Sequence, residues 1–582
     1  MDGHLISRRE WLGLTEKASH QEVLELEDLP PVTSGISPYT GTFGDAELLH
    51  LLKRVLFGIT KADLNAFAGK SLNQVVDQLL TVPTTLDSFP LNHYASKDTA
   101  NVALGSTWVN SILPYNNTDA VIENNQRRNS LLFWNIGNCI DQNASIYEKL
   151  VLYWHNYFPI DIKLVTSSQR DYLYVKTIRE NVGASLKDLC FKMTKDLAML
   201  NYLNGELNMK NAPDENFGRE LQELFTVGKV LPTDQRYTED DVKAAARVLT
   251  GHGSVSANGL DAVYGFKINS HDTGDKQFSA FYNNKVIKGR STATAGDDEL
   301  NDLLDMIFSK ENIEGRVYST AQVVGHHMIE KVYRFFVYYE INDSIQTNVI
   351  IPLAKLYVEN DFKLLPVLKV LFTSQHFFDM ACRGCYIKTP LDVVAGLCRT
   401  LGVTINKTDT KVQYTTYNVL WSRADEMQLG YLSPPNVAGL PAFYQTPNFH
   451  QLWINSDTLP MRQEFARKLV SALGVRETYS GVSVEIKIDA LKFIKTLKNP
   501  SDPNKLLEEL SDLLLGIKLS DEHKTKIKTD FLLTGQLSDD YWTTAWITAI
   551  AIGATDTQIA TAENRLLKLL DYLVSIEEFQ LC

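Results

Sequence analysis

Cysteine is scarce in this sequence, with six in 582 residues. A small secreted protein held together by disulfides would carry many more for its length. The six are widely scattered, and a single Cys-x-x-Cys pair among them is by itself a weak zinc signal. The pattern favours reduced thiols without a shared metal. The positions are Cys139, Cys190, Cys382, Cys385, Cys398 and Cys582.

Long apolar runs are missing as well. No window approaches the roughly 18 to 20 uninterrupted apolar residues of a membrane-spanning helix, so no membrane span is expected. Residues 7–12 read SRREWL, which is similar to the twin-arginine export consensus, but polar residues follow where an apolar region is required. The signal peptide is therefore incomplete, and a cytoplasmic location is the first expectation.

Positive charge is in deficit. The chain carries 57 Lys plus Arg against 70 Asp plus Glu, a net charge of -13. This charge repels nucleic-acid phosphates and anionic lipid surfaces, so no nucleic-acid partner is predicted. The sequence has no G-x-S-x-G elbow, no phosphate-binding loop, no dinucleotide fingerprint and no His-Glu-x-x-His motif. No particular reaction, substrate or cofactor is predicted.

Apolar residues at helical spacing fill most of the chain. The predicted fold class is mainly α, a multi-helix bundle with a small β-hairpin insertion near residues 262–290. We expect an N-terminal arm at 1–41, a helical core at 42–462 and a C-terminal helical region at 463–582. The core ends in a loop rich in Pro, Asn and aromatic residues at 430–462, and a loop of this length is often functional.

Local signals add four further predictions. Ser145 and Glu148 have the spacing of a capping box at the start of a helix. Residues 168–203 read as helical, while 403–418 suggest a loop or a weak strand. The only convincing strands are predicted within 262–290, where an Asn-Asn turn and the polar insert HDTGDKQ accompany β-type residues.

The densest charge pattern runs from residue 211 to 251. Pro213 and Asp214 predict a helix start, and Gly228 a stop, for a helix over about residues 215–227. On a helical wheel Glu220 falls inside the apolar face, where a buried carboxylate needs a partner. We expect that partner to be Arg247 or Arg219. A second helix then begins at a capping box made by Thr238 and Asp241.

Several segments occur in a fixed order that resembles a known family. They are HLLKRVLFG (50–58), EKLVLYWHNYF (148–158), the segment from Lys195 to Gly228, YTEDDVKAAARVLTG (237–251), FKINSHDTGDKQF (266–278), IKTPLDVVAGLCRTLG (387–402) and LSPPNVAGLP (432–441). Together they resemble the bacterial family called domain of unknown function 1800, over most of residues 45–462. The family pattern is close to WHNHF, NENFARELLELFTLG and PPNVAGWP. The chain departs from it at Tyr157, Asp214, Gly218 and Leu440.

The resemblance implies no established activity. Members of the family are commonly exported and are often encoded beside a sulfatase-like family. The resemblance therefore implies an extracytoplasmic location and a sulfatase-like partner protein, as alternatives to the cytoplasmic expectation.

Polar residues within these motifs are the candidate site. His155, Glu220 and Glu223 are the candidate catalytic residues, since imidazole and buried carboxylates suit proton transfer or Zn, Fe or Mn binding. The metal, if any, is unknown. The hairpin tip at 271–276 is expected to lie over this pocket. The candidate binding residues are Glu215, Asn216, Arg219, Arg247, His271, Asp272, Asn156 and Trp453.

Two functional hypotheses use the same residues. In the first, arginines neutralise the glutamates and fix the helix register, because Arg219 is four residues from both Glu215 and Glu223. The chain would then be a scaffold with a central polar pocket that works as an accessory or assembly partner. In the alternative it is a metal-dependent or acid/base enzyme, such as a hydrolase.

Overall fold

The computed structural model describes residues 34–115, 117–228, 237–440 and 453–582. In these residues the chain is mainly α-helical, with three sheets of two short strands each. The predicted fold class is confirmed.

Helices of the first part of the chain are α2 (Asp45–Val55), α3 (Lys61–Phe67), α4 (Leu72–Leu79), α5 (Thr118–Asp141), α6 (Tyr147–Tyr157), α7 (Ser168–Glu180), α8 (Leu186–Thr194) and α9 (Leu197–Tyr202). The middle part contributes α10 (Asn216–Glu223), α11 (Glu239–Val248), α12 (Ala295–Ile307), α13 (Thr320–Phe336), α14 (Asp343–Ile345), α15 (Ile351–Glu359) and α16 (Leu364–Phe372).

The last part contains α17 (Pro390–Thr400), α18 (Thr410–Glu426), α20 (Thr458–Leu469), α21 (Ala490–Ile494), α22 (Pro503–Leu514), α23 (Asp521–Ile527), α24 (Asp540–Ile550) and α25 (Asp556–Ser575). The strands are β1 (His252–Ser254), β2 (Tyr264–Phe266), β3 (Lys276–Gln277), β4 (Val286–Ile287), β5 (Val475–Tyr479) and β6 (Val482–Ile486).

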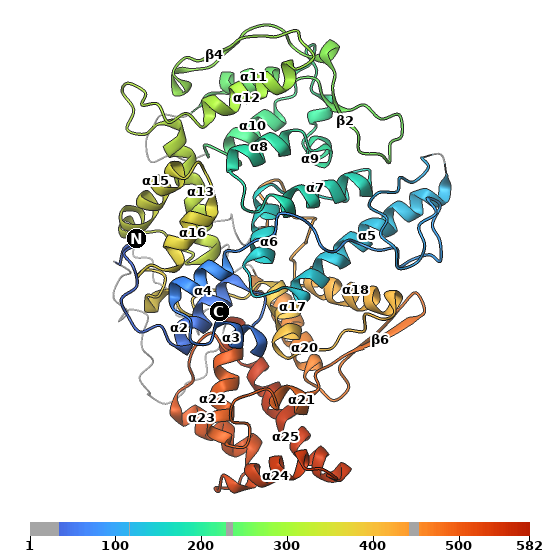
Figure 1. The fold of residues 1–582 in the computed structure, drawn as a ribbon, viewed down its shortest axis with the longest axis vertical. Coiled ribbons are helices and arrows are strands. Elements are labelled where there is room, and N and C mark those ends of the chain that lie inside the picture. Colours follow the sequence, from blue (N-terminus) through green and yellow to red (C-terminus); the bar gives the residue numbers. More distant parts are fainter. Residues whose placement is uncertain (1–33, 116, 229–236, 441–452) are drawn as a thin grey trace.

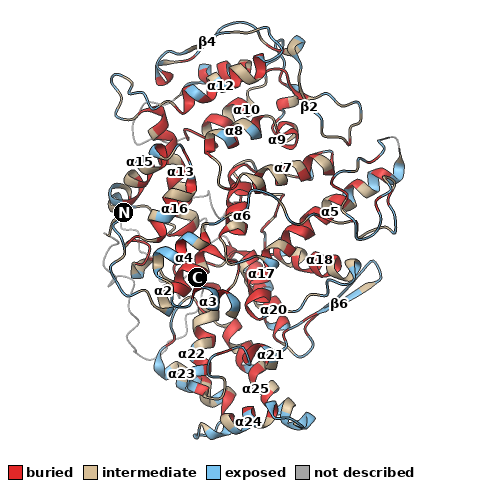
Figure 2. Cartoon of the chain, in the orientation of Figure 1, coloured by how far each residue is buried: buried red, intermediate tan, exposed pale blue. Residues whose placement is uncertain are grey.

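The helices form an elongated molecule (Figure 1). α5, α6 and α17 lie across its middle, α11 and α12 with β2 and β4 form one end, and α22 to α25 form the other. The long helix α5 packs against α7, α17 and α18. Buried residues, red in Figure 2, line the helix faces that meet in the interior. One large hydrophobic core therefore connects segments from the start, middle and end of the chain.

Buried ion pairs lock the central helices to one another. Arg179 of α7 forms two hydrogen bonds of 2.9 Å with the carboxylate of Glu148 on α6. The predicted capping box of Ser145 and Glu148 is therefore wrong. The helix begins one residue later, after Ile146, and the Ser145 hydroxyl donates to the backbone oxygens of Leu79 and Thr81. A buried arginine without a carboxylate would be costly, so Glu148 serves that pairing instead.

The predicted hairpin insertion consists of two separate ribbons. β2 pairs with β1, which precedes the predicted insertion, and β3 pairs with β4. The Asn-Asn turn was correctly predicted, since Asn283 and Asn284 both have positive φ angles. The two β-type segments do not pair with each other, because one pairs with β1 and the other pairs with β3, which is formed by the last two residues of the HDTGDKQ insert.

Two further predictions differ from the structure. Residues 410–418 belong to helix α18, whose start is capped by Asp409 through hydrogen bonds to the backbone amides of Lys411 and Val412. Strands β5 and β6 form a five-residue antiparallel hairpin in a region predicted to be helical. Its turn, Ser480-Gly481, has positive φ at both residues, as a type I′ hairpin turn requires.

The N-terminal arm is described from residue 34 onward, and residues 1–33 of the prediction lie outside the described residues. Residues 34–41 lie against the end of α16, where Tyr39 donates its backbone amide to Thr373. Residues 441–452 of the predicted aromatic loop also lie outside the described part. Of the helices in the four described ranges, none is long and apolar enough to cross a membrane.

Candidate functional site

The last turn of α6 carries His155 and Asn156, and both side chains hold the segment 430–440. His155 Nε2 lies 3.2 Å from the backbone nitrogen of Leu432, which donates to it. Asn156 Oδ1 accepts a hydrogen bond of 2.7 Å from the backbone amide of Leu440. The WHN and PPNVAGL motifs, far apart in sequence, are therefore in direct contact.

His155 is held as a neutral ring. Because Nε2 accepts from Leu432, the proton is on Nδ1, which lies 2.8 Å from the Tyr174 hydroxyl. The Tyr174 hydroxyl in turn donates to the backbone oxygen of Phe158. Burial lowers the pKa of His155 to about 3. Nε2 thus holds the 430–440 segment, while Nδ1 fixes the ring to Tyr174 of α7.

Helix α10 carries the predicted glutamates on a partly exposed surface. Arg219 binds Glu215 at 3.1 Å, which confirms that part of the predicted i,i+4 pairing. It also binds Glu239 of α11 through two hydrogen bonds of 2.7 and 2.8 Å. Nearby, the side-chain amide of Asn216 donates to the backbone oxygen of Leu203 at 3.2 Å. The Arg219 guanidinium thus joins α10 to α11.

Glu220 is half-buried, not buried as predicted. The helical wheel assumed one helix to residue 227, but α10 ends at Glu223. Beyond this residue the 100° period no longer holds, so Val227 does not extend the face that would have covered Glu220. Glu223, also half-buried, accepts a hydrogen bond of 3.4 Å from the Tyr237 hydroxyl.

The polar insert HDTGDKQ is partly buried: residues 273–275 and Gln277 are exposed, and the rest of the insert is held by contacts with the helices beside it. Arg247 of α11 binds Asp272 through Nε at 2.7 Å and Nη2 at 3.2 Å. His271 Nδ1 lies 2.9 Å from the backbone oxygen of Thr250, to which it donates. Both His271 and Lys276 are almost completely buried. Polar side chains can be buried when each finds a partner, and here the partners lie on α11 and α12.

Glu299 of α12 is the common partner of the buried pair. Its Oε2 lies 2.5 Å from Lys276 Nζ, and its Oε1 lies 3.2 Å from His271 Nε2. Burial would raise the pKa of Glu299, but the hydrogen bonds from His271 and Lys276 outweigh it and hold this pKa below its usual value. This His271–Glu299–Lys276 cluster holds the insert against α12.

Trp453, the remaining predicted binding residue, is buried at the start of the segment that leads to α20, and its backbone oxygen accepts from Thr458. Three groups of contacts thus hold the predicted residues: α6 with the 430–440 segment, α10 with α11, and the insert with α11 and α12.

Among the residues of the four described ranges, no group of three or more His, Cys, Asp or Glu side chains is arranged to hold a metal ion. Every cysteine is a free thiol.

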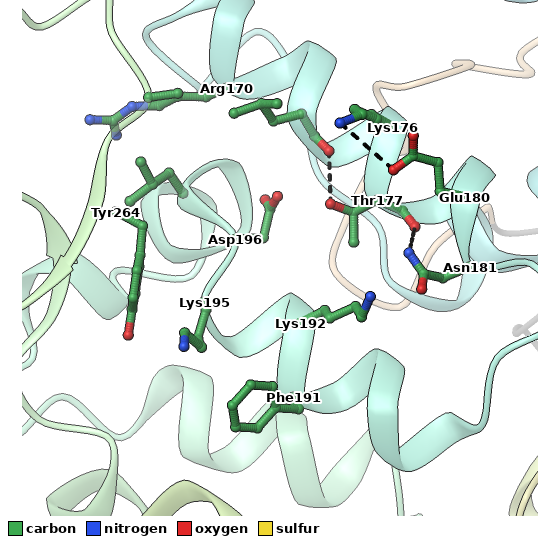
Figure 3. A pocket seen from close by; sticks show the side chains of 13 residues that line it. Arg170, Lys176, Thr177, Glu180, Asn181, Phe191, Lys192, Lys195, Asp196 and Tyr264 are labelled. Carbon is green, nitrogen blue, oxygen red and sulfur yellow. Dashed lines mark hydrogen bonds and ion pairs between the residues drawn. The ribbon is translucent and has the colours of Figure 1, made fainter. Parts of the chain in front are cut away.

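A cavity of about 450 Å³ lies elsewhere, between α7, α8, the start of α9 and strand β2 (Figure 3). Sequence reasoning missed it because the helical reading of residues 168–203 included no break between α8 and α9. The chain instead breaks after α8, and Asp196 begins α9 by accepting hydrogen bonds from the backbone amides of Ala198 and Met199. The available signal was Asp196, because Asp is favoured at the N-cap of a helix and the apolar residues Leu197, Ala198 and Met199 follow it. The charged side chains that line the cavity are Arg170, Lys176, Glu180, Lys192, Lys195 and Asp196.

Asp196 is the buried titratable group of this cavity. Its side chain is directed toward the open space (Figure 3), although the residue is only 8% exposed. Burial raises its pKa to about 7, against the opposing effects of the two backbone amides and the charge of Arg170. A carboxyl group with this pKa exchanges protons near neutral pH.

These features define a mainly α-helical protein whose sequence motifs join separate helices. A family model described as Protein of unknown function (DUF1800) matches residues 50–581, and the chain belongs to this family. The match extends through the C-terminal helices, beyond the motifs that ended near residue 441. A search of curated proteins and a search of solved structures gave no match.

Proposed function

We propose that this chain is an assembly partner of another protein, which it binds through an apolar surface on α24. The observation that carries the proposal is a stripe of exposed apolar side chains at the far end of the molecule. Tyr541, Ile547 and Ile550 of α24 are exposed, and Ile547 and Ile550 are neighbours on one side of the helix because they lie three residues apart. Leu537 before the helix is 93% exposed, and Ile552 after it is fully exposed.

The opposite face of α24 is well packed, so the exposed stripe is not a packing defect. Trp542 and Trp546 are buried and stack with ring centroids 5.8 Å apart. The Trp542 ring nitrogen donates to the backbone oxygen of Pro500 at 2.9 Å. A rigid helix that presents apolar residues outward is typical of a protein interaction surface.

Charge indicates the kind of partner. No charged residue occurs from Tyr541 to Thr555, whereas Asp539, Asp540 and Asp556 flank the segment. Carboxylates at the border disfavour an anionic lipid surface and favour a protein with an apolar groove bordered by Lys or Arg. Burying Ile552 in such a groove would contribute on the order of 1.5–3 kcal/mol.

The test compares two variants with the wild type. Ile547→Asp combined with Ile552→Asp places charge on the stripe, while Val317→Asp does so at a different exposed apolar position, 75% exposed. Proteins that copurify with the tagged chain from its own host are quantified, and each candidate is then purified and tested by direct binding. We expect one protein to bind the wild type and Val317→Asp and to lose at least about tenfold in affinity for the double variant.

Three results would contradict the proposal: no direct partner that depends on the stripe, self-association through it in light scattering, or binding of neutral lipid vesicles that the double variant loses. The family resemblance supplies a first candidate, a sulfatase-like protein from the same host. Fractionation of host cells would show whether the chain and this candidate share a compartment, which the extracytoplasmic alternative requires.

The contacts of the motif residues support a structural role for them. His155, Asn156, Arg219, Arg247 and the insert all join one helix to another segment. The alternative, a metal-dependent or acid/base enzyme that uses His155, Glu220 and Glu223, makes a separate prediction. Elemental analysis of the purified chain would then find about one Zn, Fe or Mn per molecule.

A further inference from the structure

The cavity between α7, α8 and β2 contains a cation and a carboxyl oxygen that could each bind a ligand. Most of its cations are paired: Lys195 with Asp297 at 2.7 Å, Arg170 with Glu206 at 3.0 Å, and Lys176 more loosely with Glu180 at 3.7 Å. Lys192, exposed at the cavity wall, makes no ion pair or side-chain hydrogen bond with any residue of the described ranges. Its ammonium group is therefore available to an anion.

Asp196 supplies the second unused group. Its Oδ1 accepts both backbone hydrogen bonds at the start of α9, each 3.0 Å long. Within the described part of the chain Oδ2 has no hydrogen-bond partner, and the side chain is directed into the cavity (Figure 3). Because the residue as a whole is only 8% exposed, a ligand that donates a hydrogen bond to this oxygen would stabilise it.

We propose that this cavity binds a small hydroxylated carboxylic acid of about the size of a sugar acid. The carboxylate of the ligand pairs with Lys192, and a ligand hydroxyl donates to Oδ2 of Asp196. The cavity volume of about 450 Å³ is within the range of small-molecule sites. Leu173, Phe191 and Leu197 supply the apolar part of its lining.

The surrounding cations decide between ligand classes. An amine or polyamine would meet the positive charge of Lys192, the one cation of the lining without an ion pair in the described ranges, and would leave it without an anion. A neutral sugar would leave Lys192 without an anion. The rings of Phe191 and Tyr264 are occupied by the ammonium group of Lys195, which lies 4.9 Å and 5.0 Å from their centroids. Recognition therefore rests on hydrogen bonds and charge and not on stacking.

The experiment is calorimetric titration of the full chain with D-glucuronate and D-gluconate as probes, beside D-glucose, putrescine and inorganic phosphate. Lys192→Gln removes the unpaired cation. Lys187→Gln is the matched control, since it makes the same charge change on the same helix but breaks only the exposed pair with Asp305. Asp196→Asn keeps the cap of α9 and the shape of the side chain while it removes the carboxylate.

We expect saturable binding of at least one acid probe and a loss of at least about tenfold in affinity in both Lys192→Gln and Asp196→Asn. Lys187→Gln should bind within about twofold of the wild type, because a surface pair outside the cavity contributes little. The proposal is overturned if neither acid probe binds, if Lys192→Gln binds like the wild type, or if glucose binds equally well. Binding of phosphate alone, lost in Lys192→Gln, would assign the cavity to a different ligand class.

Discussion

Polar side chains in this protein form ion pairs and hydrogen bonds with residues that are distant in sequence. Arg247 pairs with Asp272, 25 residues away, and Arg219 with Glu239, 20 residues away. The sequence identified Arg219, Arg247, His271 and Asp272 as important, because charge within motifs is visible in a sequence. It did not show that His271 is buried against Glu299, since that contact depends on how α12 packs.

Glu299→Gln should strongly destabilise the fold. The substitution removes the negative charge next to Lys276 Nζ, and an uncompensated buried ammonium group typically costs about 3–5 kcal/mol. The measurement is the free energy of unfolding in urea at pH 7. Asp275→Asn, which removes the exposed partner of Lys288, is the control and should leave the transition unchanged. A Glu299→Gln transition that coincides with wild type would mean that Lys276 is not held as a buried cation.

At the scale of elements, long amphipathic segments were predictable and short elements were not. Helix α11 begins at the predicted capping box of Thr238 and Asp241, because a cap is a local arrangement of four residues. The ends of α8 and α10 were missed, since a chain with continuing apolar spacing can still turn where tertiary packing requires it. The β5–β6 hairpin was missed although its alternating sequence and Ser-Gly turn carried the signal.

Asn156→Ala should loosen the segment 430–440 without melting α6. The backbone amide of Leu440 would lose its acceptor, and an unsatisfied buried donor costs about 1–3 kcal/mol. Hydrogen exchange followed by mass spectrometry should show faster exchange in peptides that cover residues 430–440. Asn301→Ala removes an amide that bonds only within its own helix and should leave this exchange unchanged. Equal protection in Asn156→Ala would separate the WHN motif from the loop.

At the scale of the whole molecule, the sequence predicted a mainly helical chain but not its elongated arrangement or its cavity. The cavity needs α7, α8, α9 and β2 together, and their packing angles are not encoded in any local pattern. The sequence did not predict the exposed stripe on α24 either. An uncharged segment such as 541–555 is equally compatible with burial on all sides, and only the packing of α25 shows which face remains open.

Stability should fall as the pH is lowered from 7 to 5. Burial holds the pKa of seven histidines below the usual 6.5, so only the unfolded chain takes up their protons in this range. Their contribution to the free energy of unfolding is complete above pH 6.5. It is lost as the pH falls toward the lowered pKa values of the folded protein. The histidines are His50, His93, His155, His252, His326, His327 and His376.

Four aspartates act in the opposite direction, because burial raises their pKa and the folded protein takes up protons first. They are Asp171, Asp196, Asp425 and Asp512. In the described part of the chain the histidines outnumber them, so thermal midpoints should decrease between pH 7 and pH 5. Repeating the scans at high salt separates this effect from surface ion pairs, which salt screens. A midpoint that rises toward pH 5 would contradict the assignment of neutral, buried imidazoles.

The contact of α6 with the 430–440 segment also has a kinetic consequence. His155 and Leu432 are separated by 277 positions along the chain, and Asn156 and Leu440 by 284. Closing a loop of this length gains nothing until the intervening helices are assembled, so such contacts form late during folding. The backbone amides of the 430–440 segment should therefore gain protection from hydrogen exchange in the last phase of refolding, after the helices around α5. Docking of this segment would then be a late step of folding.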